Sequence, residues 1–261
     1  MGHHGRMNAR RGVEVAPARG VAAPNTDALA QRYPRNFSFR SRRSALSDAQ
    51  QQTWQRLWPH LGTEGHRPQR PGTSGPLDLH GWFGRDAPVV LEIGSGTGTS
   101  TVTMARAEPD VDVVAVEVYR RGLAQLLCAI ERENVDNIRL IRGDALDVLE
   151  HLIAPVSLTG VRVFFPDPWP KARHHKRRLL QPATIALIAE RLRPGGVLHA
   201  ATDHPGYAEQ IAEAGDAGPR LRRAAPGAAL PISVVRPTTK YEAKARDAGS
   251  TVTELLWEKP L

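Results

Sequence analysis

Four apolar runs in the middle of the chain each contain or lead into an acidic residue, and helical patterns separate them. The runs cover residues 89–93, 113–117, 138–144 and 161–165. Such alternation predicts βαβ units and a buried parallel sheet. Any one of these acids alone could be an ordinary solvated loop residue. Because ligands bind at the carboxyl edge of open α/β sheets, we expect all four around one crevice: Glu92, Glu117, Asp144 and Asp167.

A glycine-rich turn, GSGTG at residues 94–98, follows the first run. Glycine allows a positive φ and a close approach of the backbone to a ligand, although such a turn can also simply join a strand to a helix. An NAD fingerprint needs its third glycine three residues after the second, and Thr99 occupies that place. The turn therefore favours another nucleoside-bearing cofactor, and Glu117 is placed to accept the hydroxyls of its ribose.

The fourth run leads into FFPDPWPK at residues 164–171, and a basic block follows at once. One carboxylate between two prolines, beside cations that can hold phosphates, is typical of an enzyme that acts on nucleic acid. A charge run is more often a solvated face, but its position directly after Asp167 favours phosphate binding. Trp169 either stacks on a base or plugs the loop. We expect the phosphate backbone of the nucleic acid to be contacted by Arg173, His174, His175, Lys176, Arg177 and Arg178.

Charge is uneven along the chain. Residues 1–45 hold nine arginines against Glu14 and Asp27, which accounts for seven of the net +8 charges. Residues 1–32 lack hydrophobic periodicity, so we predict a disordered basic tail. Next we expect a helical extension over 33–80, with a helix that starts at Ser47 and stops at Pro59, and with a Pro- and Gly-rich surface loop over 62–75.

The cysteine content and the hydropathy of the chain indicate its cellular compartment. The single Cys128 cannot form an internal disulfide, which indicates a reducing compartment. No apolar run approaches the roughly 18 residues that a membrane helix needs. We therefore predict a cytoplasmic protein without a membrane segment. Two histidines in the tail make a poor metal site, so no metal is expected.

These motifs together resemble the bacterial tRNA (guanine-N7)-methyltransferases, which use S-adenosylmethionine and have the class I methyltransferase fold. The resemblance covers roughly residues 33–261, and the proline-flanked acid with its basic tail is its most specific part. It rests on LEIGSGTG at 91–98, Glu117, Gly143-Asp144-Ala145, the block 166–178, Thr202-Asp203 and TKYE at 239–242.

The resemblance implies an α/β, Rossmann-like fold over residues 81–261, with a seven-stranded, mostly parallel sheet flanked by helices and an antiparallel last strand. Later strands are expected at 197–201, 232–235 and 252–257, and a helix with a cationic, phosphate-binding first turn is expected at 176–193.

The resemblance also implies the roles of the site residues, with tRNA as the partner and a guanosine of its variable loop as the target. Guanine N7 has an available lone pair, so we interpret Asp167 as a catalytic hydrogen-bond acceptor for the guanine edge and not as a strong base. The cofactor would be bound by Glu92, Gly94, Gly96, Glu117, Asp144 and Asp167. The substrate would be bound by Lys171, Asp203, Thr239, Lys240, Tyr241 and Glu242.

Two other functions remain open on the sequence alone. A class I methyltransferase for a protein or a small molecule would keep the acids of the cofactor crevice but would not need the basic block. A class I methyltransferase for another RNA is a further alternative. A non-catalytic RNA-binding subunit would need neither the full set of acids nor Asp167. The sequence is compatible with a monomer and with a homodimer.

Overall fold

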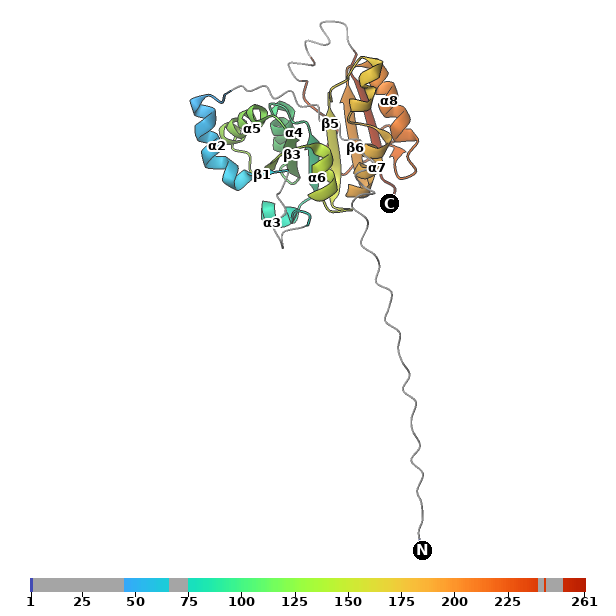
Figure 1. Cartoon of the computed structure of the whole chain (residues 1–261), viewed down its shortest axis with the longest axis horizontal. Coiled ribbons are helices and arrows are strands. Elements are labelled where there is room, and N and C mark those ends of the chain that lie inside the picture. The colour runs from blue at the N-terminus through green and yellow to red at the C-terminus, as the bar shows by residue number, and fades with distance from the viewer. Residues whose placement is uncertain (2–44, 66–74, 239–241, 243–250) are drawn as a thin grey trace. The chain divides into compact units, whose positions relative to one another are not determined.

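The computed structural model describes residues 1, 45–65, 75–238, 242 and 251–261. The described residues from 45 onward belong to one compact unit. The predicted disordered tail at 1–32 therefore lies outside the described residues, apart from Met1. The unit is built on an eight-stranded sheet of order β1-β4-β3-β2-β5-β6-β8-β7 (Figure 1).

The sheet is parallel from β1 through β6, and β8 runs antiparallel to both of its neighbours. Six of the seven expected strands correspond to β2–β6 and β8, and β1 is an additional edge strand. The strands are β1 (Gly62–Glu64), β2 (Val89–Ile93), β3 (Asp112–Glu117), β4 (Ile138–Arg142), β5 (Leu158–Phe164), β6 (Leu192–Thr202), β7 (Arg222–Arg223) and β8 (Thr253–Glu258).

Helices join the parallel strands and cover the faces of the sheet. Every residue of β2 and β3 is buried, as expected for central parallel strands covered on both faces. The α5 helix presents a continuous apolar side to this core through Leu123, Leu127 and Ile130. The α-helices are α2 (Asp48–Leu61), α3 (Leu79–Phe83), α4 (Thr99–Ala107), α5 (Arg120–Glu133), α6 (Ala145–His151), α7 (Pro182–Arg191) and α8 (Pro205–Asp216).

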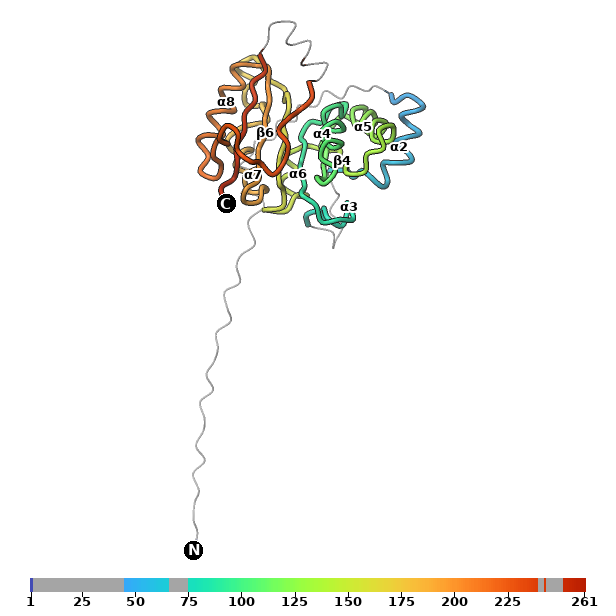
Figure 2. Tube along the Cα trace, turned by 180° about the vertical axis from the view of Figure 1, so that it is seen from behind, coloured from blue at the N-terminus to red at the C-terminus, as the bar shows by residue number. Residues whose placement is uncertain are grey.

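The α2 helix packs beside α5 at one side of the unit, as both views show (Figures 1 and 2). Ser47 starts α2 with a capping box, as predicted. Pro59 does not stop the helix, which continues to Leu61; a proline in the last turn removes only one backbone hydrogen bond. The next residues are also not a loop, because Gly62–Glu64 pairs with β4. This segment is thus continuous with the sheet.

Two other predicted elements are wrong. Residues 232–235 form no strand, and the short strand beside β8 is Arg222–Arg223. The helix predicted at 176–193 is divided into a 3-10 helix, η1 (Ala172–Arg177), and α7, which begins at Pro182. Proline favours the first helical position and disfavours helix in the residue before it, so α7 starts there. The basic block therefore does not form the start of a long helix.

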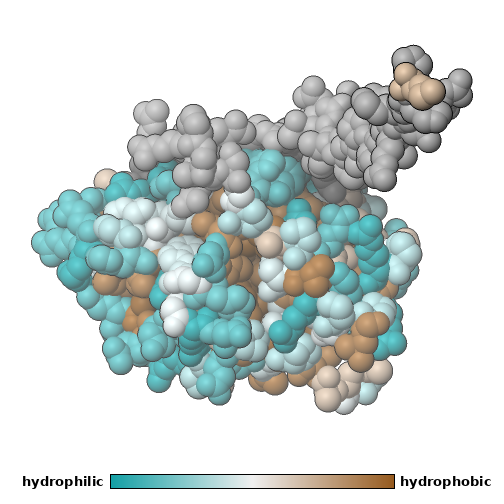
Figure 3. Space-filling view, turned by 90° about the horizontal axis from the view of Figure 1, so that it is seen from below, coloured by the Kyte–Doolittle hydropathy of each residue, from teal (hydrophilic) through white to brown (hydrophobic). Residues whose placement is uncertain are grey.

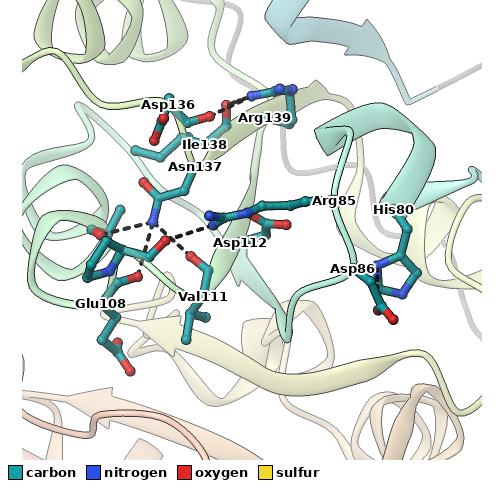
Figure 4. A network of polar contacts seen from close by, with 12 residues as sticks. His80, Arg85, Asp86, Glu108, Val111, Asp112, Asp136, Asn137, Ile138 and Arg139 are labelled. Carbon is teal, nitrogen blue, oxygen red and sulfur yellow. Dashed lines mark hydrogen bonds and ion pairs between the residues drawn. The ribbon is translucent and has the colours of Figure 1, made fainter.

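The amino edge of the sheet is held by a buried polar network (Figure 4). Arg85 donates through Nε and one terminal nitrogen to Oδ1 of the fully buried Asp112, at 2.9 and 2.6 Å. The Asn137 amide nitrogen donates at 2.8–3.1 Å to the backbone carbonyls of Ala105, Glu108 and Val111. We interpret the amino edge of the sheet as structural.

The described surface seen from below is mainly hydrophilic, with apolar residues in small groups (Figure 3).

A buried ion pair anchors the segment after β7 to the sheet. Arg162, on β5, is fully buried and donates to the Glu108 carboxylate at 2.6 Å and to the Ser233 carbonyl at 3.0 Å. The other Glu108 carboxylate oxygen accepts from the Ser233 amide. Residues 232–235 are thereby fixed against the sheet without forming a strand.

Replacing Glu108 by glutamine should lower the free energy of unfolding by about 3 kcal/mol, because Arg162 would remain buried without its ion-pair partner. Urea denaturation at neutral pH measures this loss. The matched control is Glu190→Gln, which breaks an exposed pair with Arg220 and should cost under about 1 kcal/mol. Equal losses in the two variants would contradict the structural role of the Arg162 pair.

Candidate active site

The glycine-rich turn joins β2 to α4 and lines a pocket of about 930 Å³. Gly94, Gly96 and Gly98 all have positive φ, at 79°, 56° and 80°. A Cβ on Gly98 would lie 2.4 Å from the Leu126 side chain, so this glycine permits close packing of α4 on α5. A Cβ on Gly94 or Gly96 would meet nothing within 4 Å. These two positions therefore expose backbone to the pocket in a conformation that favours glycine.

Two buried polar atoms of this pocket lack partners within the described part of the chain. Glu92 accepts at Oε1 from the Thr101 hydroxyl, at 2.9 Å, while its Oε2 has no partner. The Ser95 hydroxyl is the second such atom. Burial raises the pKa of Glu92. An unsatisfied buried polar group costs about 1–3 kcal/mol, so these two atoms are suited to a polar ligand.

Glu117 ends β3 and organises the turns around it. Its Oε2 accepts from the Gly96 amide at 2.9 Å, and its Oε1 accepts from the Val118 and Tyr119 amides at 2.7 and 2.9 Å. Burial raises the pKa of Glu117, and these hydrogen bonds oppose the rise. A carboxylate has about four lone-pair sites, so Oε2 retains the capacity for one more donor.

Asp144 follows β4 and caps α6. Its Oδ1 accepts from the Leu146 amide at 2.8 Å and, more weakly, from the Asp147 amide at 3.4 Å. Since β4 and β3 pair in parallel, Asp144 and Glu117 lie at the same edge of the sheet. The structure thus brings the predicted acids Glu92, Glu117 and Asp144 to consecutive strand ends, as the strand pattern predicted.

The loop after β5 presents Asp167 at this edge. Asp167 is exposed, and within the described residues its carboxylate has no hydrogen bond or ion pair. Burial, and to a lesser extent the charge of Asp167, raises the pKa of both Glu117 and Tyr207, the latter to about 12. The Asp167 carboxylate therefore lies close enough to the Glu117 crevice to interact with it electrostatically.

Backbone strain flanks Asp167. Phe165 and Trp169 have φ values of 51° and 42°, although neither is glycine. Each such residue costs about 1–3 kcal/mol and persists only where its surroundings hold it. The Phe165 amide donates to the Ala201 carbonyl at 2.8 Å, which extends the β5–β6 pairing by one bond. Strain of this kind is typical of functional loops.

Trp169 is held within its own loop. The Arg177 guanidinium lies 5.1 Å from the centre of the Trp169 ring, and His174 meets that ring edge-on at 5.8 Å. These contacts favour the interpretation of Trp169 as a support of the loop over that of a free base-stacking surface.

The basic block forms an exposed surface around η1. Burial, followed by the charges of Arg177 and Arg173, lowers the pKa of His174, which disfavours its charged form. His174 and His175 are half-buried, and the exposed cations are Lys171, Arg173, Lys176 and Arg177.

Arg178 departs from this pattern, and its burial argues against its predicted contact with RNA. Its side chain is 3% exposed. It donates to the carbonyls of Pro168 and Gly206 at 2.8 and 3.1 Å, and to Gln210 at 2.7 Å. Its guanidinium also lies over the Tyr207 ring, at 4.8 Å. Arg178 therefore ties the Asp167 loop to α8 and cannot neutralise a phosphate in this arrangement.

Comparison with known proteins identifies the family. The family model described as "Putative methyltransferase" matches residues 86–255. A tRNA (guanine-N(7)-)-methyltransferase of Mycolicibacterium paratuberculosis is 67% identical over 260 residues, covering 98% of this chain and 99% of that protein. One from Mycobacterium tuberculosis H37Rv is 66% identical over 263 residues, covering 99% and 96%. The chain belongs to the tRNA (guanine-N7)-methyltransferase family.

Among solved structures, the 16S rRNA methyltransferase KamB is similar to this methyltransferase, with a TM-score of 0.48 and 18% sequence identity. The similarity covers 76% of this chain and 99% of KamB.

The remaining predicted substrate residues of the methyltransferase fall into three groups. Asp203 is half-buried and directly follows β6, the neighbour of β5. Thr239, Lys240 and Tyr241 lie outside the described residues. Glu242 is 1% exposed and is ion-paired with Arg236 at 3.0 Å, so a direct contact of its carboxylate with substrate is not supported.

The described residues of the methyltransferase contain one group of side chains that could hold a metal ion. Asp147, Glu150 and His151 on α6 have ligand atoms within 4.8 Å of one another. Glu150 and His151 approach each other at 3.5 Å. Exposed acidic clusters of this kind are common without an ion. The absence of a metal stays a prediction.

Sequence reasoning missed several residues of this site. Gln50 of α2 lines the pocket from the segment expected to be an extension. Phe164, at the end of β5, and Phe165, which follows it, line the pocket as well. Ser95 lies between Gly94 and Gly96, and the glycine motif predicts a role for the backbone but none for the Ser95 hydroxyl. The aromatic pair before Asp167 could have been noticed as residues at a strand end, but nothing in the sequence links Gln50 to the glycine-rich turn.

Proposed function

We propose that this methyltransferase transfers a methyl group from S-adenosylmethionine to N7 of a guanosine in the variable loop of tRNA. The observation that supports it best is the position of Asp167. This exposed carboxylate interacts electrostatically with Glu117, and its loop leads directly into a surface of four exposed cations. A substrate held by its phosphates beside that crevice would thus meet one acceptor near the reacting methyl group.

The residues of the pocket fit S-adenosylmethionine. The unpartnered oxygens of Glu92 and Ser95 suit the polar groups of its amino-acid end. The remaining acceptor capacity of Glu117 suits a ribose hydroxyl, and Asp144 at the next strand end is placed for the adenosine end. Gly94 and Gly96 leave room for the cofactor against the backbone. When bound, this cofactor supplies an electrophilic methyl group on a sulfonium.

The protein needs to supply alignment more than proton transfer. The N7 lone pair of guanine lies in the base plane and can attack without prior loss of a proton, so correct orientation can provide much of the acceleration. We assign to Asp167 the role of accepting a hydrogen bond from the guanine edge and of stabilising the positive charge that develops on the alkylated ring. Lys171 and Asp203 would help to hold the same nucleotide.

The RNA-binding surface consists of the exposed cations on and beside η1, with His174 and His175 among them. Neutralising phosphates releases counterions, so each contact adds about 0.7–0.9 to the salt dependence of binding. None of the helices in the described ranges is long and apolar enough to cross a membrane. We place the activity in the cytoplasm, where a lone cysteine such as Cys128 stays reduced.

The direct test is an incubation of the purified full chain with labelled S-adenosylmethionine and unmodified bulk tRNA, followed by digestion to nucleosides. The label should appear in 7-methylguanosine. Mapping by cleavage at the modified base should place it in the variable loop. Label in any other nucleoside, or transfer to protein alone, would contradict the proposal.

Replacing Glu117 by alanine should weaken binding of S-adenosylmethionine by about 1.5–3 kcal/mol, the scale of a hydrogen bond to a charged group. The loss also frees the Gly96 amide, which Glu117 holds in place. Calorimetric titration measures the affinity, with the exposed Glu213→Ala on α8 as a control that should bind as the wild type does. Unchanged affinity in a folded Glu117→Ala protein would refute the assignment.

Replacing Arg173, Lys176 and Arg177 together by alanine should weaken tRNA binding and reduce the slope of log Kd against log salt by about 2–3. Binding of S-adenosylmethionine should barely change. Arg178 is left intact because its loss would release the Asp167 loop. Filter binding between about 50 and 200 mM salt covers the sensitive range. A triple variant with the original slope would show that the basic block is only a solvated face.

A further inference from the structure

Arg236 connects the buried carboxylate of Glu242 with the exposed carboxylate of Glu254, close to the Asp167 loop. Its side chain is 3% exposed. Both of its terminal nitrogens contact the Glu242 carboxylate, one of them at 3.0 Å from Oε1. Its Nε lies 3.0 Å from Oε1 of Glu254. Arg236 is thus held by two carboxylates from the C-terminal part of the chain.

The same guanidinium lies over the aromatic pair that ends β5. Its carbon is 5.0 Å from the centre of the Phe165 ring and 5.8 Å from that of Phe164. Phe165 has the strained positive φ described above and stands two residues before Asp167. The backbone amide of Phe165 is hydrogen-bonded to β6, and Arg236 contacts its ring. Both the backbone and the side chain of Phe165 are therefore held.

The guanidinium itself has a fixed position. Glu254 accepts a second contact from Nε2 of the fully buried His199, at 2.9 Å, and His199 packs edge-on against Phe164 at 4.9 Å. Hydrogen bonding to His199, together with the charge of Arg236, lowers the pKa of Glu254 against the effect of burial. Glu254 therefore stays ionised at neutral pH, and Arg236 keeps a charged partner on each side.

Packing alone does not account for this arrangement. An apolar side chain of similar volume often fills a buried site at no loss of stability, whereas a planar guanidinium offers fixed directions for its partners and a flat surface for aromatic rings. The network is built around the one strained residue that leads into Asp167.

We propose that Arg236 is a positioning residue for methyl transfer. Its ion pairs fix the guanidinium, the guanidinium fixes Phe165, and the strained backbone of Phe165 sets the direction in which the Asp167 carboxylate is presented. Arg236 does not touch the reacting atoms. This inference rests on the function proposed above and adds a residue that acts on the chemical step through the loop.

The test compares Arg236→Met and Arg236→Lys with the wild type in single-turnover methylation at saturating S-adenosylmethionine and tRNA. Arg236→Met should lose about tenfold to a hundredfold in rate, as expected for a misaligned acceptor. Arg236→Lys keeps the charge but not the planar fork, and should still lose about tenfold. The Kd values for tRNA and cofactor should stay within about threefold of the wild type in both variants.

The matched control is Arg191→Met on α7. Arg191 is also a buried arginine, and its Nε donates to the Leu149 carbonyl at 2.6 Å, a contact that involves neither the Asp167 loop nor the pocket. Arg191→Met should lower the melting temperature and leave the single-turnover rate unchanged. If Arg236→Met does not fold, the same comparison is made with Arg236→Lys.

Three outcomes would overturn the inference. The first is a rate in the folded Arg236 variant equal to that of Arg191→Met, and the second is a parallel loss of cofactor affinity and rate, which would indicate a collapsed pocket. In both of these the wild type still forms 7-methylguanosine, so the proposed function survives. A wild type that forms no 7-methylguanosine is the third outcome, and it would overturn the function and the inference together.

Discussion

Parallel pairing of β2 with β3 and β5 is the constraint on which the rest of the structure depends. This pairing sends the carboxyl ends of the central strands to one edge, so the glycine-rich turn lies between the cofactor acids on one side and the Asp167 loop on the other. The register also sets buried charges side by side, since Glu92 on β2 is opposite Arg162 on β5. The chain order reverses at this point of the sheet, where open α/β folds bind ligands.

The active site contains buried polar atoms and backbone conformations that are unfavourable for stability. The Glu92 and Ser95 oxygens are buried without partners among the described residues, and Phe165 and Trp169 hold a backbone conformation that favours glycine. Each feature costs stability. The surrounding structure offsets the cost through the Arg178 bonds to the loop backbone and through the fully paired parallel sheet. Natural proteins commonly accept such local costs at functional sites.

The sequence predicted what depends on local pattern. Apolar runs and glycine spacing located the central strands, the glycine-rich turn and the acids at the strand ends, because each signal lies within a few residues. Contacts between distant segments had no such signal. Arg178 looked like its cationic neighbours, and only its bonds to Pro168 and Gln210 show it to be internal. Likewise, nothing in the sequence joins Arg236 to Phe165, or the short strand Gly62–Glu64 to β4.

The central claim is that Asp167 orients guanine and stabilises its developing charge. The most direct measurement is the single-turnover rate of 7-methylguanosine formation by Asp167→Asn and Asp167→Ala, with the wild type followed from about pH 6 to 9. The account predicts a loss of about a hundredfold or more for Asp167→Ala, a smaller loss for Asp167→Asn, preserved tRNA affinity and a flat wild-type profile. A near-normal rate for Asp167→Ala, or a wild-type rate that rises steeply with pH, would contradict it.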